Sequence, residues 1–141
     1  DEIEGVHILG QIDDEDVIAR YMRISSAFVI PGKAGLAVNY AFAYGVPVLT
    51  RQHNYHAPEV EYIVSGENGL IVDGDFNSFV RSVAAYLNSF EAQKTFAKGA
   101  LKTRDSLSLN FMVKAFDEAI CETIRRKRGL SVGDASTAPI K

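Results

Sequence analysis

The sequence predicts an α/β protein with a doubly wound parallel sheet and helices on both faces. Short apolar runs alternate along the chain with segments whose apolar residues recur at helical spacing. Turns that contain glycine or proline separate these runs, as they do in βαβ units. With 141 residues, of which 47% are hydrophobic, the chain can bury the core that such a fold needs.

The first predicted elements are a strand and a helix. Residues 6–12 alternate as a strand does, and Gly10 interrupts the pattern. The acidic run 13–16 then offers an N-cap and a first turn that suits the positive end of a helix dipole. Apolar residues between Val17 and Met22 follow at helical spacing, which predicts an amphipathic helix.

Two strands and a short helix come next. Residues 27–30 are wholly apolar, which is typical of a strand with both faces covered. Residues 36–44 predict a helix that Gly45 stops. Residues 47–50 predict the next strand, so this stretch forms a βαβ unit.

The alternation continues after residue 50. Pro58 marks the start of a helix that Gly66 closes, with residues 65–69 forming its C-cap and the turn that follows. Residues 69–73 predict a strand, and Asp75 caps a helix that runs to Leu87.

Two further helices complete the predicted domain, over residues 91–107 and 109–128. The segment 129–141 is small, polar and aperiodic, which predicts disorder. The chain is therefore expected to form one α/β domain over residues 1–128, followed by a disordered tail.

Composition excludes several classes of function. The formal net charge of −3 argues against nucleic acid as a partner, since nucleic-acid-binding domains are usually basic. The single cysteine, Cys121, excludes a disulfide framework and a cysteine-rich zinc site, and its apolar neighbours place it in the expected core. No apolar run reaches the roughly 20 residues of a membrane span, and the first residues do not resemble a signal peptide. The chain starts without methionine and is expected to be a fragment.

The loop from Pro31 to Gly35 is the first candidate site. It follows a predicted strand and opens directly into a helix, so its free amides and the helix dipole suit a phosphate. Gly32 and Gly35 let a ligand approach the backbone, and Lys33 adds a positive charge. The loop is neither G-x-G-x-x-G nor a P-loop, and a plain βα turn with a solvated lysine is the alternative.

The loop from Arg51 to Glu59 is the second candidate site. It follows the next strand and therefore lies on the same edge of the sheet. His53 and His56 are expected to donate to a phosphate or a sugar hydroxyl, and two histidines without a third ligand do not predict a metal site. Glu59 either caps a helix or accepts hydrogen bonds from hydroxyl groups.

The motifs between residues 31 and 72, taken in order, resemble a known family. They are the Pro-Gly loop, Gly35-Leu36, an alanine-rich helix, Gly45-Val46-Pro47-Val48, a polar loop with Pro58-Glu59, and Gly66 to Val72. They resemble the C-terminal nucleotide-sugar-binding domain of retaining GT-B glycosyltransferases, the glycosyl transferases group 1. The resemblance covers residues 6–124 and implies a Rossmann-like GT-B C-terminal domain that is truncated at its N-terminus.

The resemblance also implies which residues hold the donor. The loop before Gly35 and the start of the next helix would bind the donor diphosphate, and the loop from Arg51 to Glu59 would border the donor and acceptor sugars. The implied donor-binding residues are Gly32, Lys33, Ala34, Gly35, Leu36, Tyr40, His53, His56 and Glu59. No metal ligand and no catalytic nucleophile is assigned.

The chain departs from this family at two glutamates that are separated by seven residues in its relatives. Gly32 and Tyr40 occupy those positions here. In relatives the first glutamate contacts the donor sugar and the second contacts the ribose hydroxyls. Either a divergent subfamily replaces the pair, with a hydrogen bond from Tyr40 or from its neighbour Asn39, or donor binding is weakened or lost. The retained Lys33, Gly35-Leu36 and polar loop favour the first.

The predicted function is transfer of a sugar from a nucleotide-diphosphate donor to a glycan or lipid-linked acceptor, with retention, as in polysaccharide biosynthesis. Backbone dipoles and Lys33 would stabilise the leaving diphosphate without a metal or another cofactor. The resemblance implies that the first strands of the domain and an acceptor-binding N-terminal domain are missing, so the fragment alone is expected to be inactive. It also implies a cytoplasmic location, and the basic run 125–128 indicates either a solvated helix end or a peripheral contact with the inner membrane.

Three alternatives stay open. One is another GT-B enzyme, an epimerase or a phosphorylase. Another is a non-catalytic nucleotide-sugar-binding or assembly module of the same fold, which the two replaced glutamates favour. The last is an unrelated response-regulator-like or Rossmann domain, against which the missing acidic cluster and the missing G-x-G-x-x-G argue.

Overall fold

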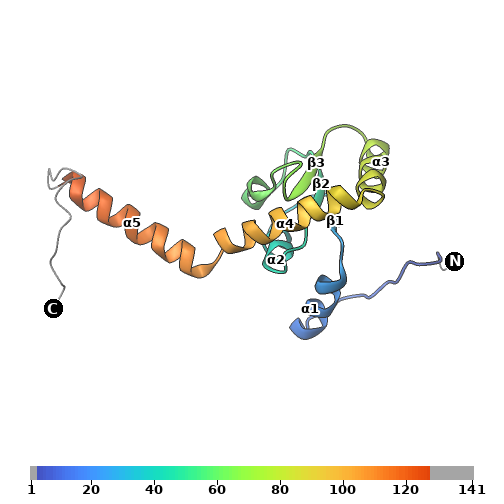
Figure 1. The fold of residues 1–141 in the computed structure, drawn as a ribbon, viewed down its shortest axis with the longest axis horizontal. Coiled ribbons are helices and arrows are strands. Elements are labelled where there is room, and N and C mark those ends of the chain that lie inside the picture. The colour runs from blue at the N-terminus through green and yellow to red at the C-terminus, as the bar shows by residue number, and fades with distance from the viewer. Residues whose placement is uncertain (1–2, 128–141) are drawn as a thin grey trace. The chain divides into compact units, whose positions relative to one another are not determined.

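The computed structural model describes residues 3–127 of the chain (Figure 1). The elements in chain order are α1 (Glu15–Ile24), β1 (Phe28–Ile30), α2 (Ala37–Ala43), β2 (Val48–Arg51), the 3₁₀ helix η1 (Pro58–Tyr62), β3 (Gly69–Val72), α3 (Phe76–Leu87), α4 (Phe90–Ser106) and α5 (Leu109–Lys127). They fall into two compact units that divide after residue 105. The predicted tail, residues 129–141, lies outside the described residues.

The three strands form a parallel sheet in the order β1-β2-β3, which confirms the predicted α/β class. Thr50 of β2 pairs with Ile30 of β1 on one side and Ile71 of β3 on the other. The crossovers through α2 and η1 both lead to the next strand in the same direction, and α2 and η1 contact each other on one face of the sheet. This arrangement leaves the carboxyl ends of all three strands at one edge.

The opposite face of the sheet carries α3. Leu49 of β2 and Val72 of β3 pack there against Phe79 and Tyr86 of α3 and Phe96 of α4. Since side chains alternate along a strand, Val48 and Thr50 point to the other face, and both are fully buried. The prediction of helices on both faces of the sheet is therefore confirmed.

The strand predicted over residues 6–12 is wrong. This segment pairs with no strand among residues 3–127, and the side chain of Ile8 is 94% exposed. Alternation alone does not stabilise a strand, because a strand needs a partner for its backbone groups.

The edge of β1 that faces away from β2 also lacks a partner among the described residues, and Val29 on β1 is 43% exposed. The prediction that both faces of residues 27–30 are covered is therefore wrong as well.

Both predicted acidic N-caps are confirmed. Asp14 precedes α1 and accepts from the amides of Asp16 and Val17 at 2.9 and 3.2 Å. Asp75 precedes α3, and the hydroxyl and amide of Ser78 donate to its Oδ1 at 2.7 and 2.8 Å. These two hydrogen bonds hold the pKa of the Asp75 carboxyl below its ordinary value, since they favour the charged form.

The helix predicted to run from Pro58 towards Gly66 is shorter than expected. It is a 3₁₀ helix that ends at Tyr62. Asn68 competes with its continuation, because its side-chain oxygen accepts from the amide of Val64 at 2.7 Å and its side-chain nitrogen donates to the carbonyl of Tyr62 at 2.8 Å. Gly66 has a φ of +86° in the turn that follows, a conformation that favours glycine. The structural role predicted for this turn is confirmed.

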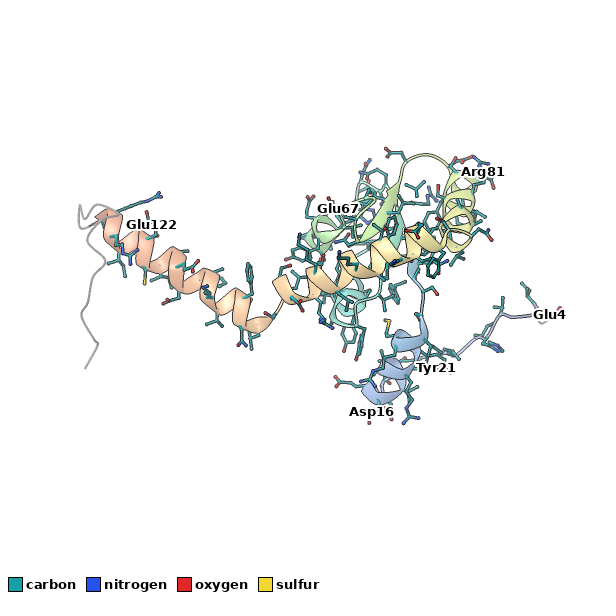
Figure 2. The ribbon with its side chains drawn as sticks, in the orientation of Figure 1. Glu4, Asp16, Tyr21, Glu67, Arg81 and Glu122 are labelled. Carbon is teal, nitrogen blue, oxygen red and sulfur yellow. The ribbon has the colours of Figure 1, made fainter. Side chains whose placement is uncertain are left out.

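Helix α4 packs closely on the turn before β3. Asn68 is only 3% exposed, and its side-chain nitrogen also donates to Thr103 Oγ1 of α4 at 2.8 Å. Gly99 lies against the backbone of Glu67, whose position beside α4 is seen in Figure 2. The contact joins the last strand of the sheet to a helix far along the chain.

Tyr86 links the core to the start of the sheet and provides a test of the fold. Its ring stacks on Phe96 with 5.2 Å between centroids, and its hydroxyl donates to the carbonyl of Ser26 at 2.7 Å. Burial raises the pKa of the Tyr86 phenol above its ordinary value of 10.0. The neutral phenol therefore contributes stability that is fully present below pH 10 and is lost as the pH rises through the raised pKa.

Tyr86→Phe is expected to lower the free energy of unfolding at pH 7 by about 1 kcal/mol, because the Ser26 carbonyl loses its donor. Above pH 10 the stability of the wild type should fall more steeply than that of the variant, so the two curves converge. Urea denaturation at pH 7 and at several values above pH 10 measures both effects. Parallel curves across that range would contradict the burial of this phenol.

The described part of the second unit is residues 106–127, most of which form helix α5. None of its residues is buried, and Cys121 on this helix is half-buried. The prediction that Cys121 lies in a core is therefore wrong, because α5 has no packing partner within its own unit among the described residues. Across residues 3–127, no helix combines the length and the apolar character that a membrane crossing requires.

Candidate functional site

The two candidate loops lie together at the carboxyl edge of the sheet. Residues 31–36 follow β1 and residues 52–57 follow β2, and these strands are parallel neighbours. The Ala57 amide donates to the Ala34 carbonyl at 2.9 Å, which joins the loops directly. Ligands of open α/β sheets bind at this edge.

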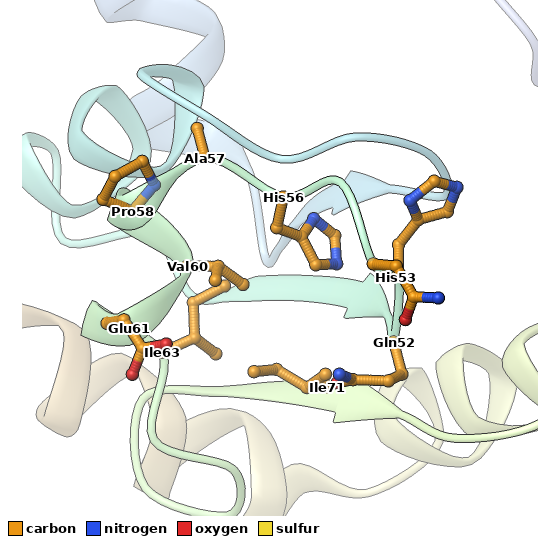
Figure 3. Close-up of a pocket in the computed structure, with 10 residues that line it drawn as sticks. Gln52, His53, His56, Ala57, Pro58, Val60, Glu61, Ile63 and Ile71 are labelled. Carbon is orange, nitrogen blue, oxygen red and sulfur yellow. The ribbon is translucent and has the colours of Figure 1, made fainter.

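His56 holds the two loops together with both of its ring nitrogens. The amide of Ala34 donates to Nδ1 of His56 at 3.0 Å. Nε2 of the same ring lies 2.7 Å from the carbonyl oxygen of Arg51 at the end of β2. The half-buried ring in Figure 3 is therefore part of the framework of the site, and its nitrogens are already occupied by backbone partners.

The loop after β1 offers unoccupied amides. Ala34 is fully buried, and its amide is the one held by His56. Within the part of the chain that the structure describes, the amides of Gly32, Lys33, Gly35 and Leu36 donate to no protein acceptor. Gly32 and Lys33 are exposed, and Leu36 is 71% exposed where α2 starts. These amides give the loop the donors that an anion needs.

A cavity of about 470 Å³ lies beside the second loop (Figure 3). Its lining residues are Gln52, His53, Asn54, His56, Ala57, Pro58, Val60, Glu61, Ile63 and Ile71. His53 is exposed, its Nδ1 accepts from the amide of Tyr55 at 3.2 Å, and its ring centroid lies 5.8 Å from that of His56. One wall of the cavity is thus apolar, from η1 and β3, and the other is rich in side-chain donors and acceptors.

The two remaining predicted residues lie outside the cavity lining. Glu59 is half-buried in η1, and its Oε2 is buried without a hydrogen-bond partner among the described residues. Tyr40 lies on α2, is 46% exposed, and its ring centroid is 6.5 Å from that of Tyr44. Asn39, beside Tyr40, also has a buried side-chain oxygen without a partner in the described part of the chain. Buried acceptors without a partner are uncommon in proteins, and a ligand could reach these two oxygens only if neighbouring side chains moved.

Sequence reasoning did not single out Arg51 or Ile71. The Arg51 guanidinium carbon lies 5.9 Å from the centroid of the Phe76 ring, and its Nε is buried without a partner among the described residues. Its position as the last residue of β2 is the signal that could have found it. Ile71 comes from β3, and only the strand register brings it under the second loop.

The arrangement as a whole suits a ligand with an anionic group and several hydroxyl groups. Exposed amides and Lys33 provide positive potential at the first loop. The cavity provides polar contacts from Gln52, His53 and Asn54 on the second loop.

Comparison with known proteins agrees with this arrangement. A family model described as glycosyl transferases group 1 matches residues 1–89, more than half of the 141-residue chain. No curated protein matches the chain. The matched region includes the sheet, both candidate loops and α3. The chain therefore belongs to the glycosyl transferases group 1, with the Rossmann-like α/β fold of a GT-B domain and with a nucleotide sugar and an acceptor as the implied substrates.

Proposed function

We propose that the chain is the donor-binding part of a retaining hexosyltransferase. In this proposal it binds a nucleotide-diphosphate sugar and, within a longer protein, passes the sugar with retention to a glycan or lipid-linked acceptor. The observation that carries the proposal is the row of unoccupied amides at Gly32, Lys33, Gly35 and Leu36, beside a polar cavity at the carboxyl edge of the sheet.

The diphosphate is assigned to the first loop. Each free amide donates a hydrogen bond to a phosphate oxygen, and Lys33 adds a charge that needs no fixed geometry. Because the leaving nucleoside diphosphate gains negative charge as the glycosidic bond breaks, donors fixed in place before the reaction stabilise the transition state. The chain's contribution to catalysis is therefore electrostatic.

The sugar and ribose are assigned to the second loop and to the acceptors near it. His53 lines the cavity, and its Nε2 makes no hydrogen bond among the described residues. This nitrogen is therefore available to a sugar or ribose hydroxyl. Tyr40 offers an exposed phenol on α2. The oxygens of Asn39 and Glu59 are buried, and ribose or sugar hydroxyls would satisfy them only if neighbouring side chains moved on binding. Ala34 and His56 support this site through their mutual hydrogen bond.

The remaining parts of the proposal concern partners and location. We expect the reaction to need no metal or other cofactor and the acceptor to be bound by a further domain. We also expect a cytoplasmic location with a peripheral contact at the inner membrane through the basic end of α5, of which residues 125–127 are described. Each of these stays a prediction.

A non-catalytic nucleotide-sugar-binding module is the second candidate. Gly32 and Tyr40, at the positions of the family's two glutamates, are the observation that favours it. A longer protein that contains this chain and binds a nucleotide sugar without ever releasing the nucleotide would support the module and contradict the transferase.

Titration of the 141-residue chain with UDP, GDP, ADP and free sugars tests the donor site. The amide signals of Gly32 and Gly35, followed by NMR, should move when a nucleoside diphosphate is added and should not move with a free sugar. The nucleotide that binds most tightly among UDP, GDP and ADP should identify the base. His53→Ala should weaken the same binding only a few-fold, about the worth of one exposed hydrogen bond. A chain with the dispersed spectrum of a folded protein whose glycine amides ignore all three diphosphates at millimolar concentration would contradict the proposal.

A further inference from the structure

We propose that His56 is a positioning residue for the donor site, acting as a clamp that holds only in its neutral Nε2–H form. The clamp joins the first loop, residues 31–36, to the second loop, residues 52–57, and its protonation weakens the binding of a nucleoside diphosphate. The ligand in this inference rests on the proposed function, whereas the clamp itself rests on the geometry of the two loops alone.

The hydrogen bonds of the ring fix its tautomer. A backbone amide can only donate, so Nδ1 of His56, 3.0 Å from the Ala34 nitrogen, carries no proton. A neutral imidazole has one proton, which must then lie on Nε2. From there it points to the carbonyl oxygen of Arg51, 2.7 Å away, which can only accept. Both hydrogen bonds are satisfied in this single form of the ring.

The clamp determines which amides of the first loop remain for a ligand. It uses the amide of Ala34, while the neighbouring amides of Lys33 and Gly35 stay unoccupied among the described residues. The hydrogen bond from the Ala57 amide to the Ala34 carbonyl, at 2.9 Å, holds the other side of the same peptide segment. With Ala34 fixed at its nitrogen and its oxygen, the flanking amides have little freedom to rotate. Preorganised donors bind an anion with less loss of entropy than mobile ones.

A proton on Nδ1 would remove the acceptor that Ala34 needs. The titratable and charged groups around the ring are His53, whose ring centroid lies 5.8 Å away, Glu61, which lines the same cavity, Lys33 next to Ala34 in the chain, and Arg51, whose guanidinium lies over Phe76. The protonated ring could only donate from Nδ1, so the Ala34 amide would turn away and the first loop would lose its anchor. Acidification should therefore weaken diphosphate binding, although it places a positive charge close to the site.

The clamp can be tested without any ligand. In the 141-residue chain at pH 8, ring ¹⁵N chemical shifts should show His56 as the Nε2–H tautomer, and the Ala34 amide should exchange slowly with solvent. His7 is exposed and gives the reference for a solvated imidazole in the same spectrum. Protonation of the ring, detected by its own ¹⁵N shifts, should move the Ala34 amide signal as well. An Nδ1–H tautomer at His56, or an Ala34 amide that exchanges as fast as a solvated amide, would overturn the clamp.

Two variants separate the acceptor of the ring from its donor. In His56→Asn the side-chain oxygen can replace Nδ1 as the acceptor for Ala34, and the residue no longer titrates. In His56→Gln the side-chain nitrogen can still reach the Arg51 carbonyl, but the acceptor next to Ala34 is lost. UDP affinity at pH 8 should stay within about threefold for Asn and fall about tenfold for Gln, the worth of one oriented hydrogen bond. His7→Gln is the matched control and should bind as the wild type does.

The pH profile distinguishes the clamp from direct contact between His56 and the ligand. The ratio of UDP affinity in the wild type to that in His56→Asn removes every pH effect that the two proteins share, including protonation of the ligand. Acidification that protonates the His56 ring should lower this ratio about tenfold. A ratio that rises on acidification would overturn the clamp and show a charged His56 binding the phosphate itself. If UDP binds neither protein while the NMR signatures of the clamp are present, the proposed function fails and the clamp stands.

Discussion

Gly99→Ala should destabilise the fold by about 3 kcal/mol, although alanine is the better helix former. In an exposed helix interior the same change would stabilise by up to about 1 kcal/mol, because glycine loses more conformational freedom on folding. At this position, however, a Cβ atom would collide with the carbonyl oxygen of Glu67 and would come within 3.1 Å of the Asn68 Cα. The obstacle is backbone, which cannot move aside as a flexible side chain can.

The collision would also separate α4 from the turn that it supports. Asn68 donates to Thr103 Oγ1 at 2.8 Å across this contact, and a displaced helix would lengthen that hydrogen bond. The buried side-chain amide would keep only the Tyr62 carbonyl as an acceptor, and its second N–H would have none. Urea denaturation of the wild type and the variant measures the loss. Gly32→Ala is the matched control, since a Cβ there meets nothing within 4 Å, and its stability should change by less than about 0.5 kcal/mol. Equal or greater stability for Gly99→Ala would show that α4 does not pack on this turn.

The elements that the sequence predicts correctly are those whose formation depends on local signals. Asp14 and Asp75 cap helices because a short acidic side chain reaches the amides of the next turn whatever surrounds it. Gly45 ends α2 because the chain turns there with a φ of +72°. These patterns involve residues that are neighbours in the chain, so a single sequence contains them completely.

The predictions that fail depend on partners elsewhere in space. Residues 6–12 have the alternation of a strand, yet nothing among residues 3–127 pairs with them. The helix after Pro58 is cut short by the side chain of Asn68, which reaches back to Val64 and Tyr62. Neither the missing strand pairing nor the competing hydrogen bonds can be seen from periodicity, which describes one segment at a time.

The candidate site was predictable as two loops but not as a set of contacts. The rule that ligands bind at the carboxyl ends of parallel strands was enough to group residues 31–36 with residues 51–59. The tautomer of His56 was not predictable, because it follows from the Ala34 amide and the Arg51 carbonyl lying on opposite sides of one ring. Sequence reasoning gave His53 and His56 the same role. In the structure both ring nitrogens of His56 have backbone partners, whereas Nε2 of His53 makes no hydrogen bond among the described residues.

Gly35→Val should weaken binding of a nucleoside diphosphate at least about 100-fold, which corresponds to roughly 2.7 kcal/mol. The amides of Gly35 and Leu36 have no protein acceptor among the described residues, so a ligand must reach them from solvent. An N–H···O hydrogen bond needs a separation of about 2.9 Å between its heavy atoms, and the methyl groups of valine would occupy that approach. Isothermal titration with UDP, or the strongest-binding diphosphate, measures the loss.

The fold should tolerate changes at Gly35, which separates a binding defect from unfolding. A Cβ atom at this position would lie 3.4 Å from the Cβ of Ala57, an ordinary contact, and the backbone does not have a positive φ. Gly35→Ala should therefore melt as the wild type does and bind with an affinity between those of the wild type and Gly35→Val. Ala43→Val places the same side chain on the exposed end of α2 and should leave binding unchanged. Equal affinities for the wild type and a folded Gly35→Val would mean that the diphosphate does not bind to the backbone of the first loop.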